Sequence, residues 1–177
     1  MKALVIAEHD NEALQAGTLN TVTAALQMAD EVDLLVAGHG CAAVAAQAAR
    51  VAGVTRVLHC EAPHYGEQLA EPLAALVCGI ASGYTHLVAP AGVSGRNLMP
   101  RVAATLGVSQ ISGIVRVDAG DTFTRPIYAG NALATVQALD SRIVLTVRAT
   151  AFAPAGGGAP VPVEPLAPAP DPALSRR

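Results

Sequence analysis

The first hundred residues alternate between short apolar runs and longer segments in which apolar residues recur every three or four positions. A continuous apolar run is typical of a strand buried on both faces of a parallel sheet, and the longer spacing indicates a helix with one buried face. Four successive strand–helix units predict a parallel sheet that is covered by helices and has right-handed connections between its strands. We expect strands at residues 3–7, 32–37, 56–60 and 86–89, and helices at residues 18–30, 41–52, 66–82 and 94–106.

The predicted helices carry recognisable end signals. Thr18 is placed as an N-cap of the first helix, since its hydroxyl can accept a bond from a free backbone N–H. Gly53, Gly83 and Gly107 follow the second, third and fourth helices, where glycine favours termination. Pro100 falls inside the fourth helix and predicts a kink or a restart there.

The pattern changes after residue 107, where four strand-like runs follow one another without helices between them. Tyr128 to Asn131 is typical of a hairpin connection. We therefore predict an α/β fold of three layers, with a mostly parallel, doubly wound sheet and an added antiparallel hairpin that also supplies an edge to that sheet. The expected strands lie at residues 110–117, 122–128, 133–139 and 142–149.

The last 25 residues differ in composition from the rest of the chain. Seven of the 12 prolines fall between Pro154 and Pro172, among alanines and glycines. Proline removes backbone donors and glycine raises chain entropy, so this segment should be extended or disordered. We predict a single domain over residues 1–152 and a linker or tail over residues 153–177.

Composition narrows the classes of partner. A chain of 177 residues with 52% hydrophobic residues supports one core, and a net charge of -3 without a basic cluster argues against nucleic acid. No apolar run approaches the roughly 20 residues that cross a bilayer, and the first residues do not resemble a signal peptide. We expect a soluble intracellular protein without membrane insertion. Cys41, Cys60 and Cys78 form no CxxC pair and are predicted to be reduced thiols.

Two glycine-containing loops leave a choice between ligand binding and local structure. Gly38 to Ala43 reads GxGxxA after a strand, as in dinucleotide sites, but small residues are common throughout and a tight turn is the preferred interpretation. Gly92 to Arg96 places a serine and a cation at a helix start, which is either an anion site or a Ser94 N-cap beside a solvated Arg96. Together these loops support an alternative function, an adenine nucleotide-binding module.

Other polar residues do not assemble a catalytic or metal site. The five histidines lack zinc-site spacing, and the aspartates fall in turns, where they form local hydrogen bonds. We therefore predict no catalytic, cofactor-binding or metal-ligating residue in this chain. Arg125, Tyr128 and Asn131 concentrate a cation, a phenol and an amide around one turn, which suits a subunit interface.

Six blocks of sequence point to a family: LVIAEHDN at 4–11, TLNTVTA at 18–24, GCAAVA at 40–45, AEPLA at 70–74, PRVAA at 100–104 and TFTRPIYAGNA at 122–132. In this order, over about residues 2–152, they resemble the electron transfer flavoprotein alpha subunit. The resemblance implies its amino-terminal domain, with an adenine nucleotide alpha hydrolase-like fold that packs on a beta subunit. It also implies that the complete heterodimer carries FAD, held mainly by a carboxy-terminal alpha domain, and that AMP, where present, belongs to the beta subunit.

The same resemblance implies a role. The complete protein would pass electrons from flavin dehydrogenases, including those of fatty acid β-oxidation, to a downstream acceptor, in the bacterial cytoplasm or the mitochondrial matrix. This chain ends at Arg177, where the family continues into the flavin domain, so we expect an excised domain or a truncated gene product. We therefore expect an electron-carrier component rather than an enzyme, with no FAD bound by the chain alone and with Arg125, Tyr128 and Asn131 against the beta subunit.

Overall fold

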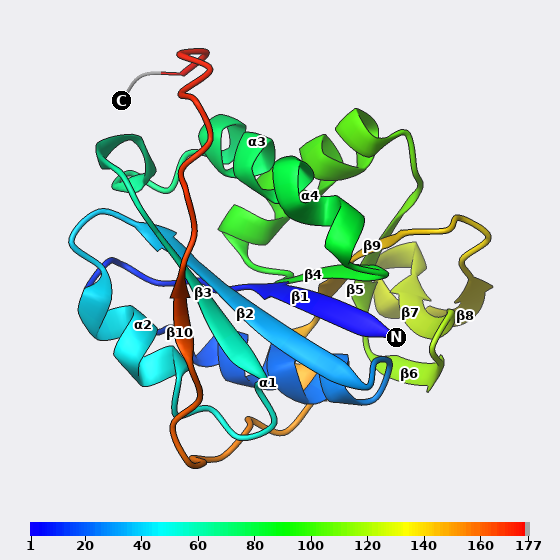
Figure 1. Ribbon diagram of the computed structural model, residues 1–177. Coiled ribbons are helices and arrows are strands. Elements are labelled where there is room, and N and C mark those ends of the chain that lie inside the picture. Colours follow the sequence, from blue (N-terminus) through cyan, green and yellow to red (C-terminus); the bar gives the residue numbers. More distant parts are fainter. Residues whose placement is uncertain (176–177) are drawn as a thin grey trace.

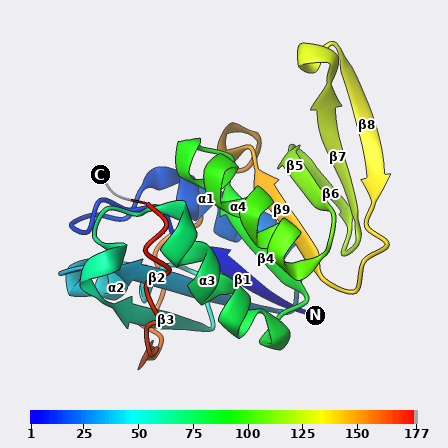
Figure 2. The same cartoon turned by 90° about the horizontal axis from the view of Figure 1, so that it is seen from above.

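A seven-stranded parallel sheet lies between two layers of helices, and a separate antiparallel sheet projects from one side (Figures 1 and 2). The computed structural model describes residues 1–175. The large sheet has the order β10-β3-β2-β1-β4-β9-β5, and the small one the order β6-β7-β8. The predicted three-layer α/β class is confirmed. The strands are β1 (Lys2–Ile6), β2 (Glu31–Gly38), β3 (Arg56–Glu61), β4 (His86–Pro90), β5 (Gln110–Ile114), β6 (Arg116–Ala119), β7 (Thr122–Ile127), β8 (Ala132–Gln137), β9 (Ile143–Val147) and β10 (Val163–Pro165).

The chain winds outward from β1 in both directions. Helices α1 (Ala16–Leu26) and α2 (Ala42–Ala48) cover one face, and α3 (Ala70–Ile80) and α4 (Val93–Leu106) cover the other (Figure 1). Alternate residues of β1 serve the two cores: Ala3 and Val5 face α1 and α2, whereas Leu4 and Ile6 face α3 and α4. The order reverses between β1 and β4, which is the point where open α/β sheets leave a crevice at their carboxyl ends.

Helix boundaries differ from the predicted ones at several places, and the second helix already ends at Ala48, four residues before its predicted end. The first helix begins at Ala16, and the Thr18 hydroxyl accepts the Glu8 N–H at 2.9 Å instead of capping a helix. The third begins only at Ala70, because a short 3₁₀ turn and the positive φ of Gln68 interrupt the helical path. Pro100 lies inside one unbroken helix, so the predicted restart is absent.

The last third of the domain forms two sheets instead of one. The expected strand at 110–117 divides near Gly113, whose φ is +65°, so that β5 joins the large sheet and β6 joins the small one. The hairpin predicted around Tyr128 to Asn131 connects β7 and β8, as expected. We call the β6–β8 sheet the arm. Phe123, completely buried, anchors the arm in the core on the face of the large sheet that α1 and α2 cover.

The proline-rich end is extended and packed against the domain. Its strand β10 pairs in parallel with β3, and the Tyr65 hydroxyl accepts the Ala169 N–H at 3.0 Å. Arg56 on β3 donates to Glu164 at 2.7 Å and to the buried Asp33 on β2 at 2.9 Å. A buried carboxylate on β2 thus connects to the last strand through one guanidinium. The division into a domain and a linker stays a prediction.

No helix within residues 1–175 is both long enough and apolar enough to cross a bilayer. All three cysteines are free, with Cys41 and Cys60 buried, which confirms the predicted thiols.

Two buried histidines predict that the fold weakens in mild acid. His86 lies 2.7 Å from the Gly120 carbonyl, His9 lies 3.0 Å from the Ala37 carbonyl, and burial lowers the pKa of both imidazoles. The unfolded chain therefore binds more protons as the pH falls below about 6.5, and stability should fall with it, by at most about 1.4 kcal/mol per pH unit for each histidine. Urea unfolding from pH 7.5 to 5 measures this slope. It should be shallower in His86→Gln, and an equal slope in that variant would contradict the assignment to His86.

Candidate functional site

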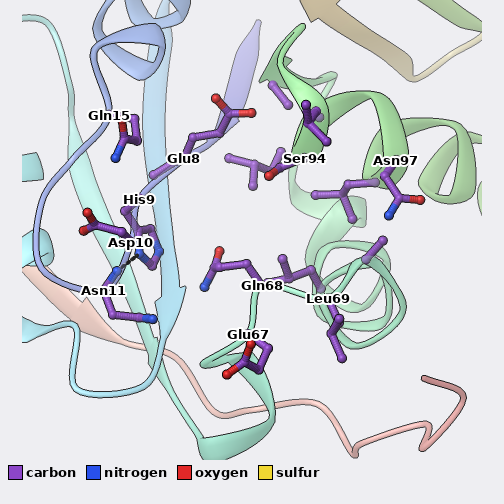
Figure 3. A pocket seen from close by; sticks show the side chains of 18 of the residues that line it. Glu8, His9, Asp10, Asn11, Gln15, Glu67, Gln68, Leu69, Ser94 and Asn97 are labelled. Atoms are coloured by element: carbon purple, nitrogen blue, oxygen red, sulfur yellow. Dashed lines mark hydrogen bonds between the residues drawn. The ribbon is translucent and has the colours of Figure 1, made fainter. Parts of the chain in front are cut away.

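A cavity of about 550 Å³ opens at the carboxyl ends of β1 and β4, where the strand order reverses. Figure 3 shows Glu8 and His9 on one wall, Ser94 and Asn97 of α4 on the opposite wall, and Gln68 with Leu69 between them. The described residues that line this cavity include carboxylates but neither lysine nor arginine. Its charge therefore disfavours a phosphate.

Glu8 occupies the end of α4 that a phosphate would need. A Cβ atom on Gly92 would lie 2.7 Å from Glu8 Oε1, and the N–H of Gly95 interacts with the same carboxylate. Burial raises the pKa of Glu8, and the bond from Gly95 offsets only part of that shift. Glu8 Oε1 has no hydrogen-bond partner among the described residues. The glycines of the predicted anion loop thus make room for the chain's own carboxylate.

The loop after β1 is fixed by hydrogen bonds that leave little polar capacity for a ligand. His9 Nε2 donates to the Ala37 carbonyl, while its Nδ1 accepts the Asn11 N–H at 3.1 Å. The Asn11 side chain donates to the Gly66 carbonyl at 2.8 Å and accepts the His39 N–H at 3.1 Å. Asn11 adopts a positive φ of 70°, which asparagine tolerates better than most residues.

The backbone N–H groups of the GxGxxA turn are also already bound by a side chain of this chain. Glu61 at the end of β3 accepts the N–H groups of Gly40 and Cys41, which precede α2. A Cβ atom on Gly38 would overlap Asn11 and approach Cys41 Sγ to 2.8 Å, so glycine is required there by packing. These contacts favour the tight-turn interpretation of the motif.

A second cavity, of about 360 Å³, carries the opposite charge. It lies between the start of α4, the ends of β5 and β9, and β7 of the arm, and three arginines line it: Arg96, Arg125 and Arg148. Within residues 1–175 none of the three forms an ion pair, and Arg125 Nε is buried without a hydrogen-bond partner. We call this second cavity, lined by Arg96, Arg125 and Arg148, the arginine cavity. Unpaired guanidiniums of this kind suit carboxylates supplied by another surface.

The three predicted interface residues are divided between this cavity and the tip of the arm. Arg125 lines the arginine cavity, whereas Tyr128 and Asn131 lie in the connection from β7 to β8. Tyr128 is 79% exposed, and Leu133 on β8 is 65% exposed. The tip of the arm stands away from the large sheet in Figure 2, and these two side chains are exposed to solvent in the isolated chain.

Sequence reasoning missed Arg148 and Glu8, and placed Arg96 in a different setting. Arg148 follows the buried strand β9, where a single cation carries no motif. Glu8 could have been found from its position directly after the first predicted strand, because strand ends at a reversal of strand order line the crevice. Arg96 belongs with Arg125 and Arg148 instead of serving the Gly92 loop as an anion site.

The sequence matches the family described as "Electron transfer flavoprotein domain" over residues 3–171. Similar proteins include the "Electron transfer flavoprotein subunit alpha" of Pseudomonas aeruginosa, 52% identical over 91% of this chain and 53% of that protein. The protein of that name from Bradyrhizobium diazoefficiens is 50% identical over 99% of this chain and 56% of its own length. The mitochondrial protein from Dictyostelium discoideum is 47% identical over 88% of this chain and 46% of its own length. The chain thus spans about half the length of these relatives.

Proposed function

Because the chain belongs to the electron transfer flavoprotein domain family, we propose that it acts as part of an electron transfer flavoprotein, as the scaffold that packs on a beta subunit. The family match over residues 3–171 is the observation that carries this proposal. The complete protein would carry electrons from flavin dehydrogenases, including those of fatty acid β-oxidation, to a downstream acceptor. In such a protein the redox chemistry belongs to the flavin, and the polypeptide supplies binding and orientation.

We assign the FAD to the part of the complete protein that this chain does not span. The cavity at the ends of β1 and β4 offers no cation to a pyrophosphate, because its described lining lacks lysine and arginine. The backbone donors before α2 and at the start of α4 are already engaged by Glu61 and Glu8. These observations support a chain that binds no FAD alone, and they weigh against the adenine nucleotide module.

The proposed contact surface combines the arginine cavity with the tip of the arm. Three guanidiniums that form no ion pair within residues 1–175 provide charge that an acidic partner surface neutralises. Tyr128 and Leu133 provide exposed apolar area beside it on the arm. Cationic and apolar groups together are typical of an interface centre, and arginine and tyrosine are the residues that most often dominate its binding energy.

The visible absorbance spectrum tests whether this chain binds FAD by itself. We expect the chain, purified after incubation with FAD, to show no flavin absorbance near about 450 nm. It should nevertheless elute together with the cognate beta subunit in size-exclusion chromatography. Excess AMP should leave the thermal midpoint of the chain unchanged. A flavin band in the chain alone would refute the assignment of FAD to the missing part, and separate elution would refute the scaffold role.

Substitutions on the proposed surface should weaken the association while leaving the fold intact. Arg125→Ala and Tyr128→Ala should each raise the dissociation constant about 5- to 30-fold, corresponding to about 1–2 kcal/mol, and Asn131→Ala should raise it less. Titration of the beta subunit measures these constants, and Arg125→Ala should also reduce their salt dependence. Leu174→Ala is the matched control, because Leu174 is 75% exposed but follows β10, at the opposite edge of the large sheet from β5 and the arm. An unchanged dissociation constant in both Arg125→Ala and Tyr128→Ala would reject this surface.

A further inference from the structure

A cysteine, a histidine and a glutamate converge at the carboxyl ends of β2 and β3, outside both cavities. Cys41 precedes α2, while His59 and Glu61 lie two residues apart on β3 and therefore point to the same face of the sheet. Cys41 Sγ lies 3.4 Å from His59 Nε2 and 3.6 Å from Glu61 Oε2. His59 Nε2 lies 3.3 Å from Glu61 Oε2.

These separations match the edges of a tetrahedral metal site. With zinc bonds of about 2.3 Å to sulfur and about 2.0–2.1 Å to nitrogen or oxygen, tetrahedral angles place sulfur about 3.5 Å from the other donors and place nitrogen about 3.3–3.4 Å from oxygen. All three observed distances agree with these values within about 0.2 Å, the tolerance expected of a metal site. The three atoms therefore surround a point that can hold an ion with little movement of the chain.

The fold holds the donors in place independently of any ion. The sheet register pairs Gly38 with Glu61, and the N–H groups of Gly40 and Cys41 donate to the Glu61 carboxylate. Cys41 is buried, whereas the side chains of His59 and Glu61 are 20% and 42% exposed, so the cluster is reached from solvent on one side. Hydrogen bonds that orient ligands in this way are typical of metal sites.

Binding of a metal at this cluster requires a proton to leave Cys41. Burial, with the adjacent Glu61 carboxylate, raises the pKa of that thiol to about 11, so an ion must displace the proton. Burial by itself would raise the pKa of Glu61. The hydrogen bonds from the N–H groups of Gly40 and Cys41 outweigh this effect, so the pKa is lowered and the carboxylate stays charged.

We propose that Cys41, His59 and Glu61 form a site for Zn²⁺ or a similar borderline-soft divalent metal. Thiolate and imidazole donors select such ions over Mg²⁺ and Ca²⁺, which prefer oxygen ligands. Three protein ligands leave a fourth position for water. His39 Nδ1 lies 3.6 Å from Glu61 Oε1, the other oxygen of this carboxylate. The proposal does not depend on the electron-transfer role.

Cobalt titration of the purified chain tests the site. Stripped of metal by a chelator, the chain should bind one equivalent of Co²⁺ and develop both a thiolate-to-cobalt charge-transfer band and the visible bands of tetrahedral cobalt. One equivalent of Zn²⁺ should remove both signals, and millimolar Mg²⁺ should not. Cys41→Ala should abolish the charge-transfer band. Glu61→Gln and His59→Ala should weaken binding by more than about tenfold, since even outer-shell partners cost 10- to 100-fold.

Cys78→Ser is the matched control, because Cys78 is a partly exposed thiol on α3 against the opposite face of the sheet. It should retain the full signal. Circular dichroism of each variant confirms folding, so a loss of binding in a folded Cys41→Ala chain supports the site even if Glu61→Gln unfolds. The absence of a charge-transfer band in the folded native chain would overturn the proposal, as would a band that persists in Cys41→Ala.

Discussion

Replacing Asp33 with alanine should lower the free energy of unfolding by about 3 kcal/mol, near the lower end of the cost of breaking a buried ion pair. The Asp33 side chain is completely buried, and its Oδ2 accepts from Arg56 at 2.9 Å and from the Tyr84 hydroxyl at 2.7 Å. Lys2 Nζ lies 3.2 Å from the same oxygen, Asp33 Oδ2. The loss stays near the lower limit because Lys2 and Arg56 reach solvent and Arg56 keeps Glu164 as a partner. Urea denaturation measures it.

Two variants separate this cost from a general effect of removing a carboxylate. Asp33→Asn keeps the shape and an acceptor for Tyr84, so its loss should be smaller than that of Asp33→Ala. Asp30→Ala removes an exposed carboxylate that pairs with the amino terminus, and it should produce no measurable change. Equal midpoints for Asp33→Ala and Asp30→Ala would show that the buried network contributes nothing.

Gly95→Ala should destabilise the chain by about 3 kcal/mol, the upper end of the usual cost of overpacking. A Cβ atom on Gly95 would overlap the carbonyl oxygen of Pro90, and a backbone atom cannot move aside by changing rotamer. The first turn of α4 must therefore shift, and the interaction of Glu8 with the Gly95 N–H should weaken with it. Thermal and urea unfolding of the purified variant measure the loss.

Gly79→Ala is the matched control for this prediction. Gly79 lies in α3, and no atom approaches within 4 Å of the position that its Cβ would take. Alanine there should stabilise the chain by about 0.5–1 kcal/mol, because glycine loses more conformational freedom in a helix. Opposite signs for the two substitutions are the expected result. A stable Gly95→Ala chain would mean that the start of α4 adapts freely.

The sequence predicted the parallel sheet well because its signal is local. Runs such as residues 3–7 and 34–37 are apolar throughout, which is typical of a strand buried on both faces. The helix starts were predicted less well, since Thr18 is held by a hydrogen bond from the Glu8 N–H and Gln68 by one to the Ala37 carbonyl of β2. The split at Gly113 was missed because an apolar strand that changes sheets looks like one continuous strand.

Candidate sites were harder to predict because they combine residues from several strand ends. Cys41, His59 and Glu61 lack the spacing of a zinc motif, and only the register of β2 with β3 brings them together. The arginine cavity likewise joins residues 96, 125 and 148 from three separate parts of the chain. The glycine motifs, in contrast, suggest ligand sites that are already filled, because Glu8 and Asn11 occupy the spaces beside these glycines.

The proline-rich strand β10 also determines how one border of the large sheet behaves toward other molecules. Without it, β3 would present a row of unpaired backbone groups, which is a template for aggregation through sheet extension. With β10 in place, the outermost strand contains Pro165, which has no N–H to offer a further strand. A segment that composition predicts to be extended or disordered thus limits sheet extension at this border.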